Sequence, residues 1–120
     1  MLKAIVVDDS KFMRSIIKDA LKNEDIEIVA EADNGHDGLA AFKKYKPDFV
    51  TMDITMGGKD GMKTVDEILT FDSSAKIIVI SALSEHTIRL NDPKKYASAY
   101  LMKPFNKEQL IETIKKLLSR

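Results

Sequence analysis

The sequence contains no cysteine and only two histidines, His36 and His86. Without cysteine the chain cannot form a disulfide, a thiolate metal site or a cysteine nucleophile. Two histidines alone are too few for the common zinc sites. Lysine plus arginine equals aspartate plus glutamate at 19 each, so the chain also lacks the basic excess that is typical of nucleic-acid binders. We therefore expect neither a zinc protein nor a nucleic-acid partner.

Long hydrophobic stretches are also missing. A membrane-spanning helix needs a run of roughly 18 or more apolar residues, and no such run is present. The apolar stretch at the N-terminus ends at Asp8 and is too short for the core of a signal peptide. The 120 residues are 44% hydrophobic and 32% charged, which fits one globular domain over residues 1–120. The expected location is the cytoplasm, with no membrane partner.

Short apolar runs alternate five times with amphipathic segments of helical length. The apolar runs predict buried or half-buried strands, at 4–7, 26–30, 49–52, 76–80 and 99–102. This alternation favours an α/β fold in which helices cover both faces of a parallel sheet.

Helix start and stop signals lie between the predicted strands. Ser10 is an N-cap for a helix over 11–22, in which Phe12, Ile16, Ile17, Ala20 and Leu21 recur at helical spacing. Further helices are predicted over 35–45, ended by a proline at 47, over 62–71, and from 107 onward behind a capping box.

A fourth helix, between the last two strands, is predicted to be short. It begins at Ser84, but Pro93 lacks an N–H donor and would clash with the carbonyl of Arg89, at a cost of about 3 kcal/mol inside a helix. We expect this helix to end by about Asn91. The stretch up to Tyr96 is expected to be irregular and to open locally more easily than the rest.

Chemically active side chains follow four of the predicted strands: Asp8 and Asp9, Asp53, Ser81, and Lys103. In open parallel sheets ligands bind beyond the carboxyl ends of the strands, so we expect these residues to converge. The three carboxylates would repel each other, and Mg²⁺, which prefers oxygen ligands, relieves that repulsion. A hydroxyl and an ammonium beside them suit a phosphoryl group, and aspartate is a known nucleophile in phosphoryl transfer. The set predicts a carboxylate that accepts a phosphoryl group.

Five short segments occur in a fixed order along the chain: Val6-Val7-Asp8-Asp9-Ser10, Met52-Asp53-Ile54-Thr55-Met56, Asp60-Gly61, Ser81-Ala82 and Tyr100-Leu101-Met102-Lys103-Pro104-Phe105. This ordered set covers essentially the whole chain and resembles the response-regulator receiver domain. The first segment, followed by Phe12-Met13-Arg14, resembles the stand-alone chemotaxis type. The resemblance implies a flavodoxin-like doubly wound sheet of five parallel strands in the order 2-1-3-4-5, with five helices.

The resemblance also implies a role for each matching residue. Asp53 is the phosphoacceptor. The Mg²⁺ ligands are Asp8, Asp9, Asp53 and the backbone carbonyl of Thr55.

Ser81 and Lys103 contact the phosphoryl group, and Lys103-Pro104 usually has a cis peptide bond in such domains. Tyr100 is the aromatic residue that turns inward when Ser81 moves; a partly buried core aromatic is the competing interpretation.

The sequence therefore predicts a stand-alone response regulator of a two-component phosphorelay, with a role in chemotaxis or motility. A sensor histidine kinase supplies the phosphoryl group, and the modified, monomeric protein binds a downstream target, for which the flagellar motor switch is a candidate. It is a signalling protein rather than an enzyme, and catalysis of its own phosphorylation and dephosphorylation stays open. The alternative is a receiver-like binding module that phosphorylation does not control.

Two other functions fit the sequence less well. A flavodoxin-like cofactor domain needs a phosphate cradle after the first strand, where Asp8-Asp9 would instead repel phosphate. A phosphatase with an aspartate nucleophile would need a second aspartate where Thr55 stands. Two residues depart from the receiver pattern: Gly57 replaces a usual proline, which predicts a more mobile loop, and Tyr96 replaces a usual glycine.

Overall fold

Five parallel strands form a single sheet in the computed structural model, which describes residues 1–54, 61–82 and 99–119. The sheet order is β2-β1-β3-β4-β5. The strands are β1 (Leu2–Val7), β2 (Ile26–Ala32), β3 (Phe49–Asp53), β4 (Ile77–Ser81) and β5 (Ala99–Met102). This order and the parallel pairing confirm the predicted flavodoxin-like fold.

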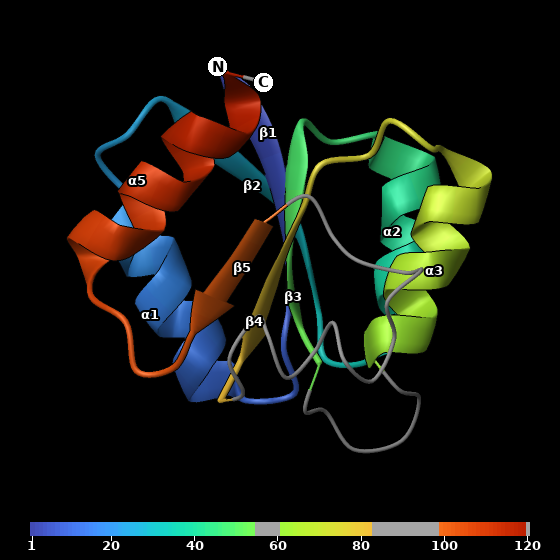
Figure 1. Cartoon of the computed structure of the whole chain (residues 1–120), viewed down its shortest axis with the longest axis horizontal. Coiled ribbons are helices and arrows are strands. Elements are labelled where there is room, and N and C mark those ends of the chain that lie inside the picture. Colours follow the sequence, from blue (N-terminus) through green and yellow to red (C-terminus); the bar gives the residue numbers. More distant parts are fainter. Residues whose placement is uncertain (55–60, 83–98, 120) are drawn as a thin grey trace.

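Helices cover both faces of the sheet. In the described ranges they are α1 (Lys11–Leu21), α2 (Gly35–Tyr45), α3 (Gly61–Phe71) and α5 (Lys107–Leu118). Figure 1 shows α1 and α5 on one face of the sheet and α2 and α3 on the other. The short helix predicted from Ser84 to about Asn91 lies outside the described residues, as does the stretch up to Tyr96 that is expected to be irregular. Thr55 and Gly57 lie outside them as well. None of the described helices has the length and apolar character needed to span a bilayer.

Capping interactions are present at the starts of three helices, and those of α1 and α5 were predicted. The side chains of Ser10 and Asn34 accept backbone N–H bonds at the starts of α1 and α2. Asn106 and Gln109 form the complete capping box of α5. Lys46 follows α2 in the left-handed conformation, at φ 45°, so the helix ends just before Pro47.

Two apolar clusters form the core, one on each face of the sheet. Alternate residues of β1 contribute to opposite clusters: Ile5 and Val7 pack with α2 and α3, and Ala4 and Val6 pack with α1 and α5. The strands β3 and β4 are buried along their whole length. Strands covered on both faces are expected to be continuous apolar runs in the sequence, as these two nearly are.

The apolar residues of α1 are less buried than their spacing suggests. Ile17 and Leu21 pack into the core, whereas Phe12 is 74% exposed and Ile16 is 38% exposed. Helical spacing predicts the amphipathic helix but does not by itself show which of its apolar residues are buried. Ile16 instead lines a surface hollow with Phe105, from the segment between β5 and α5. Helical spacing defines a strip on the helix, but the sheet covers only part of that strip.

Thr51 in β3 provides a test of the core. It is fully buried, and its Oγ1 has no hydrogen-bond partner among the described residues. Because an unsatisfied buried hydroxyl costs about 1–3 kcal/mol, we expect Thr51→Val, which keeps the shape, to raise the free energy of unfolding by about 1 kcal/mol. Urea denaturation followed by circular dichroism measures this change. Thr70→Val, at an exposed position of α3, is the control and should change little; a less stable Thr51→Val protein would contradict the prediction.

Candidate functional site

The carboxyl ends of the strands lie level with one another. Val7 pairs with Met52, Met52 with Val79, and Val79 with Tyr100. Because these strands are parallel, the residues that follow this level emerge at one edge of the sheet. The register therefore places Asp8 and Asp53 side by side, and Ser81 and Lys103 just beyond them along β4 and β5.

Three carboxylates gather at this edge. One carboxylate oxygen from each of Asp8, Asp9 and Asp53 lies within 4.8 Å of the other two. Asp8 and Asp53 are 1% and 2% exposed, whereas Asp9 is open to solvent. The predicted convergence of the three acids is confirmed in its geometry.

The loop after β1 holds Asp8 in a fixed orientation. The backbone N–H of Asp8 donates to the carbonyl of Ala32 in β2, at 3.0 Å. The Asp8 Oδ1 atom accepts from the backbone N–H of Ser10, at 2.9 Å. Ser10 in turn caps α1 by accepting from the backbone N–H of Met13, at 3.2 Å. The carboxylate is thus tied to the sheet and to the start of α1.

The second oxygen of Asp8 is suited to a cation. Asp8 Oδ2 is buried and has no hydrogen-bond partner among the described residues. Burial raises the pKa of Asp8 from 3.8 to about 6; the hydrogen bond from Ser10 opposes this rise, and the nearby charge of Asp53 adds to it. The Lys103 ammonium lowers the pKa of Asp8 but does not offset its burial, so a hard divalent cation would supply the positive charge that the buried carboxylates still need. The residues present therefore fit Mg²⁺.

The raised pKa of Asp8 predicts a stability change. A carboxyl whose folded pKa exceeds its unfolded value destabilises the protein as pH rises from about 4 through 6. Without Mg²⁺ at pH 7, Asp8→Asn should therefore raise the free energy of unfolding by about 1–2 kcal/mol. At pH 4 the variant and the parent should have nearly the same free energy of unfolding. Urea unfolding at both pH values measures this difference. Asp19→Asn, at an exposed position of α1, is the control. If the difference in stability between Asp8→Asn and the parent does not depend on pH, the titration of Asp8 is not its cause.

Lys103 contributes the positive charge next to Asp53. Its Nζ lies 3.4 Å from Asp53 Oδ2. The backbone N–H of Lys103 donates to the carbonyl of Ser81, at 2.7 Å, which fastens the residue after β5 to the end of β4. The Lys103–Pro104 peptide bond is cis, as the resemblance implied. Ser81 is fully buried at the end of β4.

Tyr100 packs against the apolar cluster that contains α2 and α3. Its side chain is partly buried, and its hydroxyl oxygen is shielded from solvent. This position is compatible with both the switch role and the core-aromatic interpretation. Thr55, the remaining predicted metal ligand, lies outside the described residues.

Gly61, the first residue of α3, packs directly against the backbone that follows the phosphoacceptor candidate. A Cβ atom at this position would lie 2.5 Å from the Cα of Ile54 and 2.7 Å from the carbonyl oxygen of Asp53. Such distances are too short, so glycine lets α3 begin against the end of β3. Gly61 belongs to the Asp60-Gly61 segment of the receiver pattern, but nothing in the sequence indicates this close approach.

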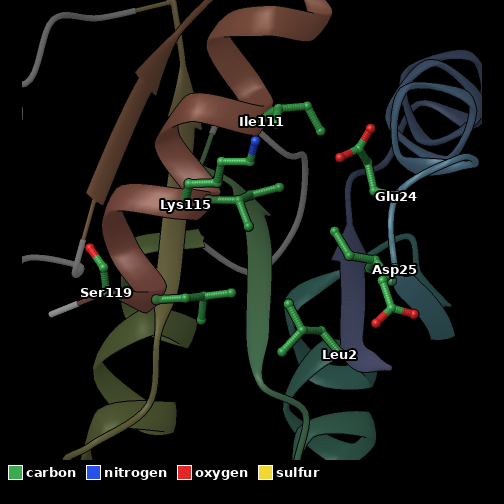
Figure 2. Close-up of a pocket in the computed structure, with 9 residues that line it drawn as sticks. Leu2, Glu24, Asp25, Ile111, Lys115 and Ser119 are labelled. Atoms are coloured by element: carbon green, nitrogen blue, oxygen red, sulfur yellow. The ribbon is translucent and has the colours of Figure 1, made fainter.

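A separate pocket of about 370 Å³ lies at the opposite end of the sheet. Figure 2 shows Ile111 and Lys115 of α5 on one side of it, with Glu24, Asp25 and Leu2 on the other. Because Leu2 begins β1 and Asp8 follows its end, this pocket is remote from the carboxylates. It is therefore separate from the site formed by Asp8, Asp9 and Asp53.

Comparisons with known proteins agree with the geometry. Residues 4–115 match the family described as the response regulator receiver domain. The chain is 40% identical over 116 residues to the chemotaxis protein CheY of Listeria monocytogenes, spanning 97% of this chain and 98% of that protein. It is 38% identical to CheY of Bacillus subtilis, spanning 98% of each chain.

A solved structure with a similar fold is the CheX–CheY–BeF3–Mg²⁺ complex from Borrelia burgdorferi. The two chains superpose with a TM-score of 0.92 at 26% identity, over 99% of this chain and 90% of the other.

Proposed function

The chain belongs to the response regulator receiver domain family, and on this premise we propose that residues 1–120 form a chemotaxis-type regulator phosphorylated on Asp53. The CheY proteins of Listeria and Bacillus match over almost their whole length, which supports a chemotaxis role. The observation that carries the proposal is the position of Asp53: a buried carboxylate between an acidic pair and the Lys103 ammonium. No feature of the described residues favours the alternative of a binding module that phosphorylation does not control.

The phosphoryl transfer follows from the residues around Asp53. A carboxylate oxygen of Asp53 attacks the phosphorus of a phosphohistidine on the kinase, so that a new O–P bond forms as the P–N bond breaks. The imidazole nitrogen leaves with the electron pair and takes up a proton. Asp53 then carries the phosphoryl group as an acyl phosphate.

Asp8, Asp9 and Asp53, with the Thr55 carbonyl, would hold Mg²⁺. When bound, the ion neutralises the charge of the phosphoryl oxygens and of the acids. Support comes from the orphaned Asp8 Oδ2 and from the Borrelia relative, whose complex includes Mg²⁺ and BeF3.

Lys103 and Ser81 would convert the modification into a change of surface. The Lys103 ammonium, now beside Asp53, is close enough to pair with a phosphoryl oxygen instead. The Ser81 hydroxyl would donate to a second oxygen, and Tyr100 would follow it inward. We propose that a downstream target, such as a CheX-type protein or a flagellar motor switch component, binds this changed surface of a cytoplasmic monomer.

Intact mass spectrometry tests the proposed function. The protein is incubated with Mg²⁺ and a small acyl phosphate, which avoids the need for a cognate kinase. We expect a mass gain of one phosphoryl group that is stable in acid, labile in base and located on Asp53 by peptide mapping. An unmodified protein, or a phosphoryl group on another residue, would overturn the assignment.

A further inference from the structure

Arg14 connects α1, β2 and the acidic loop after β1. Its side chain is only 15% exposed, although the residue lies in a surface helix. Arg14 Nη1 donates to the backbone carbonyl of Asp8 at 2.6 Å, and Arg14 Nε donates to Glu31 Oε1 of β2 at 3.1 Å. One guanidinium therefore joins the edge strand of the sheet to the residue that supplies the buried carboxylate.

The hydrogen bond from Arg14 to the Asp8 carbonyl links the helix to the loop that carries Asp8 and Asp9. Asp8 lies just beyond the last residue of β1 that pairs with β2, so its carbonyl is past the end of the ladder. Its N–H is bound by Ala32, its Oδ1 by Ser10, and its carbonyl by Arg14. Arg14 thus holds the peptide that leads from Asp8 to Asp9, and the orientation of this peptide sets where the Asp9 side chain begins relative to the Asp8 carboxylate.

Lys18 offers an internal comparison. It lies one turn after Arg14 on α1, and its Nζ binds the other oxygen of Glu31 at 2.7 Å. Both residues carry one positive charge and share Glu31 as a partner. Arg14 alone of the two contacts the acidic loop. The planar guanidinium has donors in fixed directions, which suits it to binding two acceptors at once.

We propose that Arg14, anchored by Glu31, is a positioning residue that holds the Asp8–Asp9 loop in the geometry needed to bind Mg²⁺. This inference rests on the proposed function, because that function places Mg²⁺ at these carboxylates. The two possible effects of Arg14 on the metal have opposite signs. Its positive charge alone would weaken cation binding, whereas its hold on the loop strengthens it.

Calorimetric titration with Mg²⁺ at pH 7 separates the two effects. We expect Arg14→Met to bind Mg²⁺ about tenfold more weakly than the parent, in the range found when groups that orient metal ligands are removed. Lys18→Met loses the same charge from the same helix but leaves the Asp8 carbonyl bound, so its affinity should be unchanged or slightly higher. Arg14→Lys keeps the charge but lacks the fixed donors of the guanidinium, so its Mg²⁺ affinity should lie between those of the parent and Arg14→Met. It replaces Arg14→Met in the test if that variant does not fold.

Phosphorylation from a small acyl phosphate gives a second measurement. If Arg14 acts by positioning the metal ligands, the Mg²⁺ concentration for half-maximal rate rises in Arg14→Met, and the rate recovers at saturating Mg²⁺. A general loss of structure would not be corrected in this way.

The outcomes distinguish this inference from the proposed function. A parent protein that binds no Mg²⁺ would contradict both. If the parent binds Mg²⁺ and accepts a phosphoryl group, then equal affinity in Arg14→Met overturns the positioning role alone. Tighter binding in both Arg14→Met and Lys18→Met would show that Arg14 acts only through its charge.

Discussion

Replacement of Asp53 by asparagine is expected to abolish phosphorylation while the fold is kept. The amide is nearly the same size as the carboxylate, so the buried position at the end of β3 remains filled. An amide oxygen is a much poorer nucleophile for phosphorus, so no acyl phosphate should form. The change also removes one of three neighbouring negative charges. We therefore expect a free energy of unfolding equal to or above that of the parent.

Intact mass after incubation with Mg²⁺ and a small acyl phosphate measures the loss, and circular dichroism checks the fold. Asp19→Asn, at an exposed position of α1, is the matched control and should gain one phosphoryl group as the parent does. A phosphorylated Asp53→Asn protein would move the acceptor to another residue.

The site at Asp8, Asp53 and Lys103 could be predicted from the sequence because the carboxyl ends of parallel strands meet at one edge of the sheet. Apolar runs identified the strands, and the residues after each run had to meet at one edge. Asp8, Asp53 and Lys103 each follow such a run directly, so neither distances nor side-chain orientations were needed to bring them together. The structure added the unsatisfied Oδ2 of Asp8, which depends on how Ser10 and the sheet enclose the residue.

The residues that support the site could not be predicted from the sequence. Arg14 and Glu31 are ordinary charges on an amphipathic helix and an edge strand, and only the packing of α1 beside β2 joins them. Gly61 is needed because α3 starts against the backbone of Ile54, a close approach that no spacing in the sequence reveals. The exposure of Phe12 likewise depends on how much of α1 the sheet covers.

Asp9→Ala and Lys103→Ala should separate metal binding from phosphoryl binding. Asp9 offers one of the three carboxylate oxygens that would hold Mg²⁺, so its loss should weaken Mg²⁺ binding about tenfold or more and slow phosphorylation with it. Lys103 supplies no metal ligand, and its ammonium repels a cation. Lys103→Ala should therefore bind Mg²⁺ as tightly as the parent or more tightly.

Phosphorylation of Lys103→Ala should have a different consequence. Without the ammonium 3.4 Å from Asp53, nothing at that position can pair with the phosphoryl oxygens. Any phosphorylated Lys103→Ala protein should thus fail to change the environment of Tyr100, which NMR of the three tyrosine rings can follow in the parent and the variant. Calorimetry with Mg²⁺ completes the comparison. If Asp9→Ala binds Mg²⁺ like the parent, the acidic pair does not hold the metal; if phosphorylated Lys103→Ala shifts Tyr100 like the parent, Lys103 does not transmit the signal.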